Sequence, residues 1–204
     1  MPPTKRLFLK TELEPRLAEA QAGQRAVFFV DAAHFVLGSF LGWLWCMTRV
    51  FVRASSGRQR YNVLGAINAV TLELVRVAND GYITATTVCE LLGKLAALNL
   101  AVPITVVMDN ARYQRCQLVQ TLARQLNIEL LFLPSYSPNL NLIERLWKFV
   151  KKTALNSRPH GSFAEFRRAI DQCLDEMPTT HRTHIATLMA PRFQTFEHVL
   201  KLAA

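Results

Sequence analysis

The sequence predicts an α/β protein built on a mixed sheet with helices on its flanks. Apolar, strand-like runs dominate the first half of the chain, whereas helical and strand patterns alternate in the second half. Half of the 204 residues are hydrophobic, which is enough for a chain of this length to bury a core of its own. We expect one main domain over 25–178, preceded by a lead-in helix within 1–24 and followed by a helical tail over 179–204.

The first expected strand spans residues 25–31 and ends on an acid. Residues 26–30 are all apolar, as in a strand that is buried on both faces of a sheet, and Asp31 follows at the expected strand exit. Residues 5–22 show a weak helical pattern, which Pro15 interrupts and Gly23 closes. A helix is therefore expected to lead into a central strand.

Three more strand-like segments complete the first half. Residues 35–48 are rich in aromatic and β-branched side chains and predict a second strand, bent at one of its glycines. Residues 60–70 predict a third strand, and residues 72–78 are a candidate for a short additional one, with turn-forming residues between the segments. These segments indicate an antiparallel meander.

Helices and strands alternate in the second half. Besides the helix described next, the apolar spacing predicts helices over 84–98, 112–126, 162–177 and 181–189. Strands are expected over 104–108, which runs into Asp109, and over 128–133. Strands in sequence followed by alternating helices and strands are the order of the ribonuclease-H-like fold. We therefore expect a mixed five-stranded sheet flanked by helices.

Residues 133–152 place a rigid loop before a helix that carries one acid, Glu144. Two prolines stiffen the loop, and Asn139 or Asn141 can cap the helix, whose apolar residues form a stripe. Three lysines follow the acid within two turns: Lys148, Lys151 and Lys152. This pattern has two interpretations, an ordinary surface pair between Glu144 and Lys148, or a helix that binds a polyanion.

The charge balance favours a partner that carries phosphate. Lys and Arg outnumber Asp and Glu by 24 to 15, and the sequence pI is about 9.8. A nucleic acid is the first partner to expect and an anionic membrane surface the second. No acid occurs from Ala32 to Leu72, a stretch that contains the arginines Arg49, Arg53, Arg58 and Arg60. These arginines are either a DNA-binding surface or the solvated tip of a hairpin.

The cysteines and the apolar segments exclude several classes of protein. Cys46, Cys89, Cys116 and Cys173 are far apart, so neither a zinc site nor a disulfide framework is indicated, and we expect reduced core thiols. Charged residues interrupt the N-terminus, so no secretory signal is evident. The longest apolar run, 35–47, is shorter than the roughly 18 residues of a membrane-spanning helix. We expect a soluble protein of the cytoplasm with no membrane partner.

Three carboxylates stand where a metal site can form. Asp31 and Asp109 each follow an apolar strand, and Glu144 begins a helix. Mg²⁺ and Mn²⁺ prefer oxygen ligands, and two such ions about 3.5–4 Å apart can promote cleavage of a phosphodiester. If the three acids converge without a metal, their charges repel, and we expect a raised pKa for at least one of them.

The segments around these acids resemble one family closely. They are Phe-Phe-Val-Asp31, Val-Met-Asp109-Asn-Ala-Arg-Tyr and Tyr136-Ser-Pro-Asn-Leu-Asn-Leu-Ile-Glu144-Arg-Leu-Trp. They are similar to the DDE catalytic domain of transposases from bacterial insertion sequences related to mariner elements. The spacing agrees, because 34 residues separate Asp109 from Glu144, as in the Asp-Asp-34-Glu branch. The resemblance covers residues 12–196.

The resemblance implies a function in DNA transposition. Asp31 would bridge two Mg²⁺ or Mn²⁺ ions, and Asp109 and Glu144 would each complete one site. Water would cut double-stranded DNA at a transposon end, and the freed 3′-hydroxyl would attack target DNA, usually at TA. Lys148, Lys151, Lys152 and Asn110 would contact phosphates, although a turn-forming role is an equal alternative for Asn110. The resemblance also implies a homodimer assembled on DNA, associated with a bacterial nucleoid.

The chain departs from this family at its front. Relatives usually carry about a hundred N-terminal residues with a helix-turn-helix that recognises the transposon ends, and Asp31 comes too early for such a region. The chain therefore resembles the catalytic half alone, with the helix-turn-helix as a separate partner.

The sequence is compatible in part with three other functions. The first is a nuclease of the same fold without strand transfer, and the second is a non-catalytic DNA-binding remnant of a transposase. A phosphatase is disfavoured because Ala32 and Ala33 follow Asp31 in place of an Asp-x-Asp motif.

Overall fold

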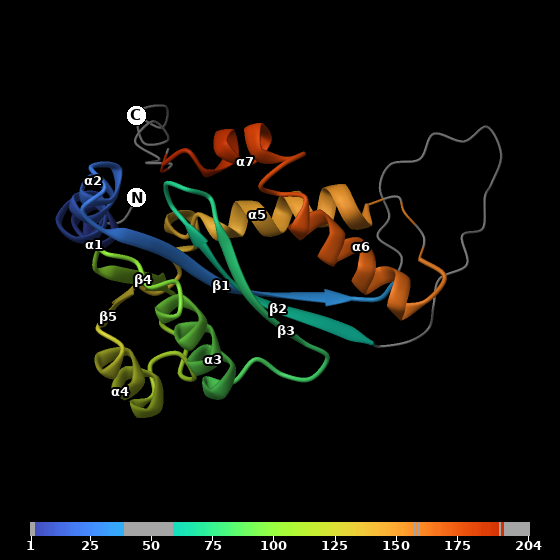
Figure 1. Ribbon diagram of the computed structural model, residues 1–204, viewed down its shortest axis with the longest axis horizontal. Coiled ribbons are helices and arrows are strands. Elements are labelled where there is room, and N and C mark those ends of the chain that lie inside the picture. The colour runs from blue at the N-terminus through green and yellow to red at the C-terminus, as the bar shows by residue number, and fades with distance from the viewer. Residues whose placement is uncertain (1–2, 39–58, 157, 159, 192, 194–204) are drawn as a thin grey trace, which may run out of the picture.

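A five-stranded mixed sheet forms the centre of the protein (Figure 1). The computed structural model describes residues 3–38, 59–156, 158, 160–191 and 193. The strand order is β3-β2-β1-β4-β5, with bounds β1 Ala26–Val36, β2 Arg60–Asn68, β3 Leu74–Asn79, β4 Ile104–Met108 and β5 Ile128–Phe132. β1 is antiparallel to β2 and parallel to β4, β2 is antiparallel to β3, and β4 is parallel to β5. The predicted mixed five-stranded sheet is confirmed.

Helices cover both faces of the sheet (Figure 1). One face carries α3 (Ala85–Ala96) and α4 (Gln117–Gln125), and the opposite face carries α5 (Ile143–Val150), α6 (Phe163–Asp175) and α7 (Arg182–Met189). The N-terminal helical segment consists of α1 (Pro3–Phe8), the π-helix η1 (Leu9–Leu13) and α2 (Glu14–Gln21). Two short segments flank α5, the 3-10 helix η2 (Pro138–Leu140) and the π-helix η3 (Lys151–Leu155).

The alternation of side chains along β1 divides the core in two. Phe28 and Val30 are buried against α3 and α4, whereas Phe29, Ala33 and Phe35 are buried with residues of α5, α6 and α7. Successive residues of a strand point to opposite faces, so the side chain of Asp31 points to the same face as those of Phe29 and Ala33. The strand therefore turns Asp31 toward the α5 face of the sheet.

Local signals explain where several helices begin. The backbone N–H of Thr84 donates to the Thr87 hydroxyl (3.2 Å) in a capping box, so Thr84 is the cap of α3. The Ser162 hydroxyl accepts from the backbone N–H of Glu165 (3.2 Å) at the start of α6, as predicted. These caps satisfy backbone donors that have no partner within the helix.

The first strand differs from its prediction. β1 does not end at Asp31 but continues to Val36, because β2 goes on pairing with it after β4 has ended. Phe35 and Val36 therefore belong to β1 and do not begin a second strand. The rest of that predicted second strand falls mostly within 39–58, outside the described residues.

Two predicted helices also have different limits. The N-terminal segment is helical on both sides of Pro15, because this proline lies in the first turn of α2, where its missing N–H is tolerated. Gly23 follows with φ +72°, a conformation that suits glycine, and the predicted helix end is correct. α4 begins at Gln117 rather than 112, since the Ala111 carbonyl accepts from Gln114 and Arg115 in a tight turn.

The cysteines are only partly in the core. Cys89 and Cys116 are free and half-buried, and Cys173 is free and buried, which raises the pKa of its thiol to about 11. Cys46 lies outside the described residues. Within the described part of the chain, no helix has the length and apolar character needed to cross a membrane.

Candidate active site

The register of the sheet places Asp31 and Asp109 on neighbouring strands. Val30 of β1 is opposite Met108, the last residue of the parallel strand β4, so Asp31 and Asp109 each follow one member of this pair. Neighbouring strands lie about 4.8 Å apart, and both acids follow residues that point to the α3–α4 face. Strand alternation therefore directs both toward α5. The site forms where β4 ends, and not where β1 ends.

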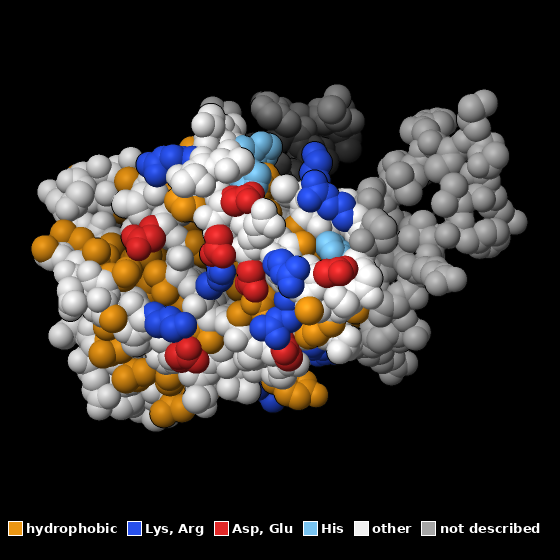
Figure 2. Space-filling model, turned by 45° about the vertical axis from the view of Figure 1, so that its right-hand side comes forward, with side chains coloured by type: hydrophobic (Ala, Val, Ile, Leu, Met, Phe, Trp, Pro, Cys, Tyr) orange, Lys and Arg blue, Asp and Glu red, His pale blue; other side chains and the backbone are white. Residues whose placement is uncertain are grey.

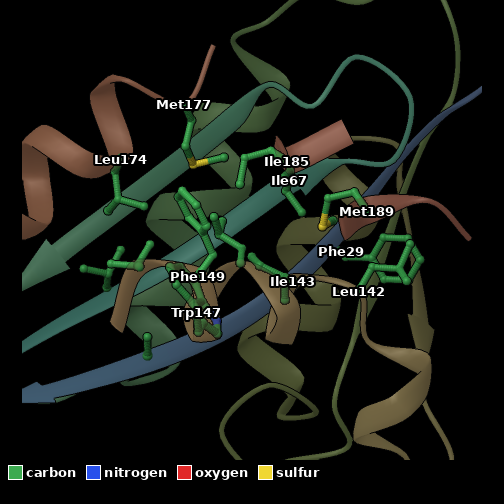
Figure 3. Packing of buried hydrophobic residues seen from close by; sticks show 14 of the residues in the cluster. Phe29, Ile67, Leu142, Ile143, Trp147, Phe149, Leu174, Met177, Ile185 and Met189 are labelled. Carbon is green, nitrogen blue, oxygen red and sulfur yellow. The ribbon is translucent and has the colours of Figure 1, made fainter. Parts of the chain in front are cut away.

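Glu144 reaches the same place from the first turn of α5. The loop before this helix is anchored to the sheet, because the Leu133 N–H donates to the Met108 carbonyl (2.9 Å). The apolar stripe of α5 then lies against the sheet, where Ile143 and Trp147 are buried in the same core cluster as residues of α6 and α7 (Figure 3). This packing leaves Glu144 half-buried beside the two strands.

Asp31 is influenced electrostatically by the other two acids. The pKa of Asp31 is raised to about 7, first by burial, next by the charge of Glu144, and to a smaller extent by the charge of Asp109. Burial also raises the pKa of Asp109. Burial and the charges of Asp31 and Asp109 raise the pKa of the Tyr113 hydroxyl as well. The expectation that neighbouring acids raise a carboxylate pKa is met by Asp31, whereas the pKa of Asp109 is raised by burial. Tyr113 is a neighbour to which the sequence assigned no role.

Asn141 does not cap α5. The cap position is Leu142, with no hydrogen bond from a side chain, and Asn139 does not provide one either. Asn141 is 2% exposed, and its Nδ2 donates to the Val30 carbonyl (3.1 Å) next to Asp31. A hydrogen bond from Asn141 also opposes the rise in the pKa of Asp109. The side chain therefore connects the start of α5 to both strands that carry an acid.

Trp147 is a second contact that the sequence did not reveal. Its indole Nε1 donates to Asp31 Oδ2 (3.0 Å), although the sequence had assigned this residue to the apolar stripe. A usable signal was present, because Trp147 follows Glu144 by three residues and shares its side of the helix. α5 therefore brings an acid and a hydrogen-bond donor to the same strand.

The acids have no cationic partner in the part of the chain that the structure describes. None of its ion pairs includes Asp31, Asp109 or Glu144, so the alternative of a surface pair between Glu144 and Lys148 is not formed. Among the same residues, no three His, Cys, Asp or Glu side chains are grouped closely enough to hold a metal ion. The acids share an electrostatic neighbourhood without forming a complete coordination shell.

The chemistry of these groups fits a hard divalent cation. Carboxylate oxygens are the preferred ligands of Mg²⁺ and Mn²⁺, and the charges at this site lack compensation by Lys or Arg within the described residues. The buried Oδ1 of Asn141 also has no hydrogen-bond partner there. The three acids have to come closer together before they can hold one ion.

Two adjoining cavities open beside the acids. One, of about 580 Å³, lies between α5 and α7 and is lined by Glu144 and Lys148. The other, of about 380 Å³, is lined by Asp109 and by the 94% exposed Tyr136. Pro138 lines both cavities. Glu144 and Asp109 therefore each line a cavity, and Asp31 lines neither of the two.

The structure brings only some of the predicted DNA contacts to these cavities. Lys148 lines the first, and Asn110 lines the second while accepting from Arg115 (3.3 Å). Lys151 and Lys152 are exposed on η3, beyond these cavities. Arg60 is exposed and five residues along β2 from the partner of Asp31, a separation of about 17 Å.

Three further arginines were predicted to contact DNA. Arg49, Arg53 and Arg58 lie outside the described residues. On the face shown in Figure 2, Lys and Arg side chains are interspersed with Asp and Glu. The net charge of the sequence is therefore not gathered into a basic patch on that face.

Solved structures of Mos1 mariner transposase share this fold. The Mos1 mariner paired-end complex with Mn gives a TM-score of 0.60 at 15% identity, covering 97% of this chain and 65% of that one. The Mos1 strand transfer complex gives a TM-score of 0.59 at 14% identity, covering 95% and 62%. The chain spans less than two thirds of the length of these transposase chains, and its fold is ribonuclease-H-like.

Comparison with sequences gives the family. No curated protein matches the chain. The family model described as DDE superfamily endonuclease matches residues 27–167, which include all three acids and more than half of the chain. Because this model matches more than half of the chain, the chain belongs to the DDE superfamily endonuclease family.

Proposed function

We propose that the chain is the catalytic domain of a transposase that cuts DNA and transfers a strand with Asp31, Asp109 and Glu144. The observation that carries this proposal is the electrostatic coupling of Asp31 to the other two acids at the end of β4. Each acid comes from a different segment of the chain, and a fold that gathers uncompensated carboxylates in this way favours a site for ligands.

The chain's own residues orient the acids. The backbone N–H of Ala32 and the indole of Trp147 hydrogen-bond to Asp31, and Asn141 hydrogen-bonds to Asp109. Three carboxylates offer enough oxygens for a pair of divalent ions when phosphate and water complete the coordination. The chemistry supplied by bound Mg²⁺ or Mn²⁺ is Lewis-acid stabilisation of the negative charge on a phosphodiester during cleavage.

The two cavities provide the path for the substrate. Lys148 lies in the same cavity as Glu144 and can hold a phosphate of double-stranded DNA near the acids. Asn110 lies with Asp109 in the second cavity and provides an amide for a further phosphate contact. We propose transposon ends as the first substrate and target DNA, at TA, as the second. Lys151, Lys152 and the arginines of residues 49–60 would contact more distant phosphates.

The larger assembly is part of the same proposal. The similar structures include paired-end and strand transfer complexes of Mos1, and the chain covers only 62–65% of those chains. We propose that two copies of the chain act together on DNA, with end recognition supplied by a separate helix-turn-helix region. A bacterial insertion sequence of the mariner-like superfamily, acting at the nucleoid, is the proposed source.

The domain limits follow the same division. We propose residues 25–178 as the catalytic domain, with 1–24 as a lead-in helix and 179–204 as a helical tail. The described part of the tail contains α7, whose Ile185 and Met189 are buried with α5.

Two assays test the function. Supercoiled plasmid should be nicked by the purified protein in Mg²⁺ or Mn²⁺ and should remain intact in EDTA. An oligonucleotide with a free 3′-hydroxyl should then become joined to target plasmid. Nicking without joined product would replace the proposal with a nuclease. DNA binding with a steep salt dependence but no nicking would replace it with a non-catalytic DNA-binding protein.

A further inference from the structure

We propose that Trp147 is the positioning residue for Asp31 and that Gly65 provides the space this requires. The inference rests on the proposed function, because it assigns to Asp31 a role that needs a fixed orientation. Gly65 of β2 is opposite Asp31 in the strand register, and the ring of Trp147 from α5 lies against Gly65 while its N–H reaches the Asp31 carboxylate. Neither residue carries chemistry of its own in the reaction.

The hydrogen bond from Trp147 has an unambiguous direction. An indole N–H can only donate, so the 3.0 Å contact orients Asp31 Oδ2 as an acceptor. The indole carries no charge, and the carboxylate therefore keeps its net negative charge for a cation. The Ala32 N–H hydrogen-bonds to the same carboxylate. Two neutral donors thus restrict the rotation of Asp31 while leaving its charge uncompensated.

The ring itself is held by packing. Trp147 is 3% exposed, and the ring of Phe35 meets it edge-on, with centroids 6.3 Å apart and an interplanar angle of 81°. Figure 3 shows the indole among the buried side chains of α5, beside Ile143 and Phe149. A side chain fixed on several sides can transmit its own position to the group that it contacts.

Gly65 makes the close approach of the ring possible. It is the residue of β2 directly opposite Asp31 in the antiparallel register. A Cβ atom at this position would lie 2.8 Å from Trp147 Cη2 and 3.0 Å from Cζ2, and also 3.2 Å from Ile143 Cδ1. The two nearest atoms belong to the rigid ring of Trp147 in a packed core, so any larger residue at position 65 has to displace the indole. The absence of a side chain at position 65 therefore sets the distance between α5 and Asp31.

A purely structural explanation accounts for less of this arrangement. A buried indole N–H needs an acceptor, but a backbone carbonyl meets that need without burying a charge. Here the acceptor is an acid with no ion-pair partner among the described residues, placed opposite a glycine in the middle of a strand. A buried acid without an ion pair and a glycine in the middle of a strand each destabilise a sheet. A role in orienting Asp31 explains why both are present.

The hydrogen bond can be tested without metal or DNA. In the ¹⁵N-labelled protein in EDTA, the indole N–H signal of Trp147 is the one that disappears in Trp147→Phe. This signal should move upfield in Asp31→Asn, because a charged acceptor deshields the proton more strongly than a neutral amide. An unchanged signal in Asp31→Asn would overturn the proposal.

The positioning role is then tested with metal and DNA. Trp147→Phe keeps most of the ring volume but removes the donor. We expect Mn²⁺ affinity in a calorimetric titration, and kcat for nicking, to fall by about 10–100-fold, with KM for DNA unchanged. Wild-type Mn²⁺ affinity and kcat in this variant would refute the inference. A wild-type protein that neither binds Mn²⁺ nor nicks DNA would instead overturn the proposed function.

A pair of glycine variants provides the matched control and does not depend on how Trp147→Phe folds. Gly65→Ala should displace the indole, shift its N–H signal and lower kcat by about tenfold or more. Gly93→Ala, in α3 on the other face of the sheet, introduces a Cβ with nothing within 4 Å, so signal and kcat should stay at wild-type values. Equal kcat values and signals in the two variants would contradict the role of Gly65.

Discussion

Carboxylates lie at both ends of the parallel strands β4 and β5, and those at one end differ from those at the other in their ion-pair and hydrogen-bond partners. Glu129, in β5, is opposite Thr105 near the start of β4 and accepts from its hydroxyl (2.7 Å). Arg16 (2.6 Å) and Arg25 (2.7 Å) also pair with it. The hydrogen bond from Arg16 is the main reason why the pKa of Glu129 lies below its usual value. This acid joins the N-terminal helix to the edge of the sheet.

The acids at the other end of β4 form none of the ion pairs of the described residues, and the pKa values of Asp31 and Asp109 are raised. The pKa of Asp31 is raised to about 7 by burial and by neighbouring negative charge, and within the described residues no Lys or Arg pairs with it. The donors that contact Asp31 are the neutral groups of Ala32 and Trp147.

The difference teaches how to separate structural from functional acids in this fold. A carboxylate that holds elements together is paired and has a lowered pKa, as Glu129 does. Carboxylates kept for a ligand are oriented but not neutralised, so their own protein destabilises the charged form. The end of the strand matters as well, since ligand sites of α/β sheets lie beyond the carboxyl ends of the strands.

The largest expected effect comes from neutralising the unpaired acids. Asp31→Asn, Asp109→Asn and Glu144→Gln should each lower Mg²⁺-dependent nicking by at least about 10³-fold, because each removes an anionic ligand. The melting temperature in EDTA should stay the same or rise for Asp31→Asn, since a buried charge is removed. Plasmid nicking and thermal unfolding are the measurements.

Glu129→Gln is the matched variant at the paired end of the strands. It should retain nicking because Glu129 contacts Arg16, Arg25 and Thr105 and none of the proposed catalytic acids. Full nicking by any of the three neutralised variants would remove that acid from the site.

The second effect is stabilisation by metal. If the unpaired acids bind Mn²⁺, a concentration of 100 times Kd should stabilise the fold by about 2.7 kcal/mol. For a chain of this size this corresponds to a rise of about 5–11 °C in melting temperature. The rise should be much smaller in Asp31→Asn and unchanged in Glu129→Gln. An equal rise in all three proteins would show that Mn²⁺ binds elsewhere.

The third effect is a loss of stability at the paired end. Glu129→Gln removes the charge that Arg16 and Arg25 share, and should lower the free energy of unfolding by about 1–2 kcal/mol, discounted for the partial exposure of the group. Glu90→Gln is the control, because the exposed pair of Glu90 with Lys94 contributes only a few tenths of a kcal/mol. Urea unfolding measures both, and a larger loss in Glu90→Gln would reverse the comparison.

The stabilisation that Glu129 contributes should depend on pH. The pKa of Glu129 is lowered in the folded protein, so its stabilisation is present above the usual value of 4.5 and disappears as pH falls through the lowered pKa. The difference in stability between wild type and Glu129→Gln should therefore shrink below about pH 4.5. A difference that grows on acidification would contradict the assigned pairing.

The smallest expected effect concerns a single phosphate contact. Lys148→Ala should lower the slope of log K against log salt for duplex DNA by about 1, because one cation is lost beside Glu144. Lys94→Ala removes the same charge from α3, on the opposite face of the sheet, and should leave the slope unchanged. Fluorescence anisotropy at several salt concentrations measures the slope for each variant. Equal slopes for the two variants would show that DNA does not bind at Lys148.

Much of the fold was predictable because its signals are local. The apolar run before Asp109 and the spacing within α3 and α6 depend on residues close together in the sequence. The candidate acids were identified in the same way, from their places after strands and in the first turn of a helix. The length of β1 was not predictable, since its second half is a strand only because β2 pairs with it.

The contacts of Asn141 and Trp147 were missed for a related reason. In the sequence, Asn141 has the properties of a helix cap and Trp147 those of an apolar stripe. Their actual partners, Val30 and Asp31, are more than a hundred residues away in the chain. Local pattern assigns a residue to an element, but it does not identify the side chain that the element meets.

By itself, the sequence determined the class of the fold, most of the helices and the family, and it identified three candidate acids, because these depend on residue type and spacing along the chain. Only the tertiary structure decided that β4 ends beside Asp31, that Glu129 is paired while Asp31 is not, and that Gly65 admits the ring of Trp147. The physical reason is that hydrogen bonds, desolvation and steric exclusion act over a few ångströms. The distances that set them therefore exist only after remote segments have packed together.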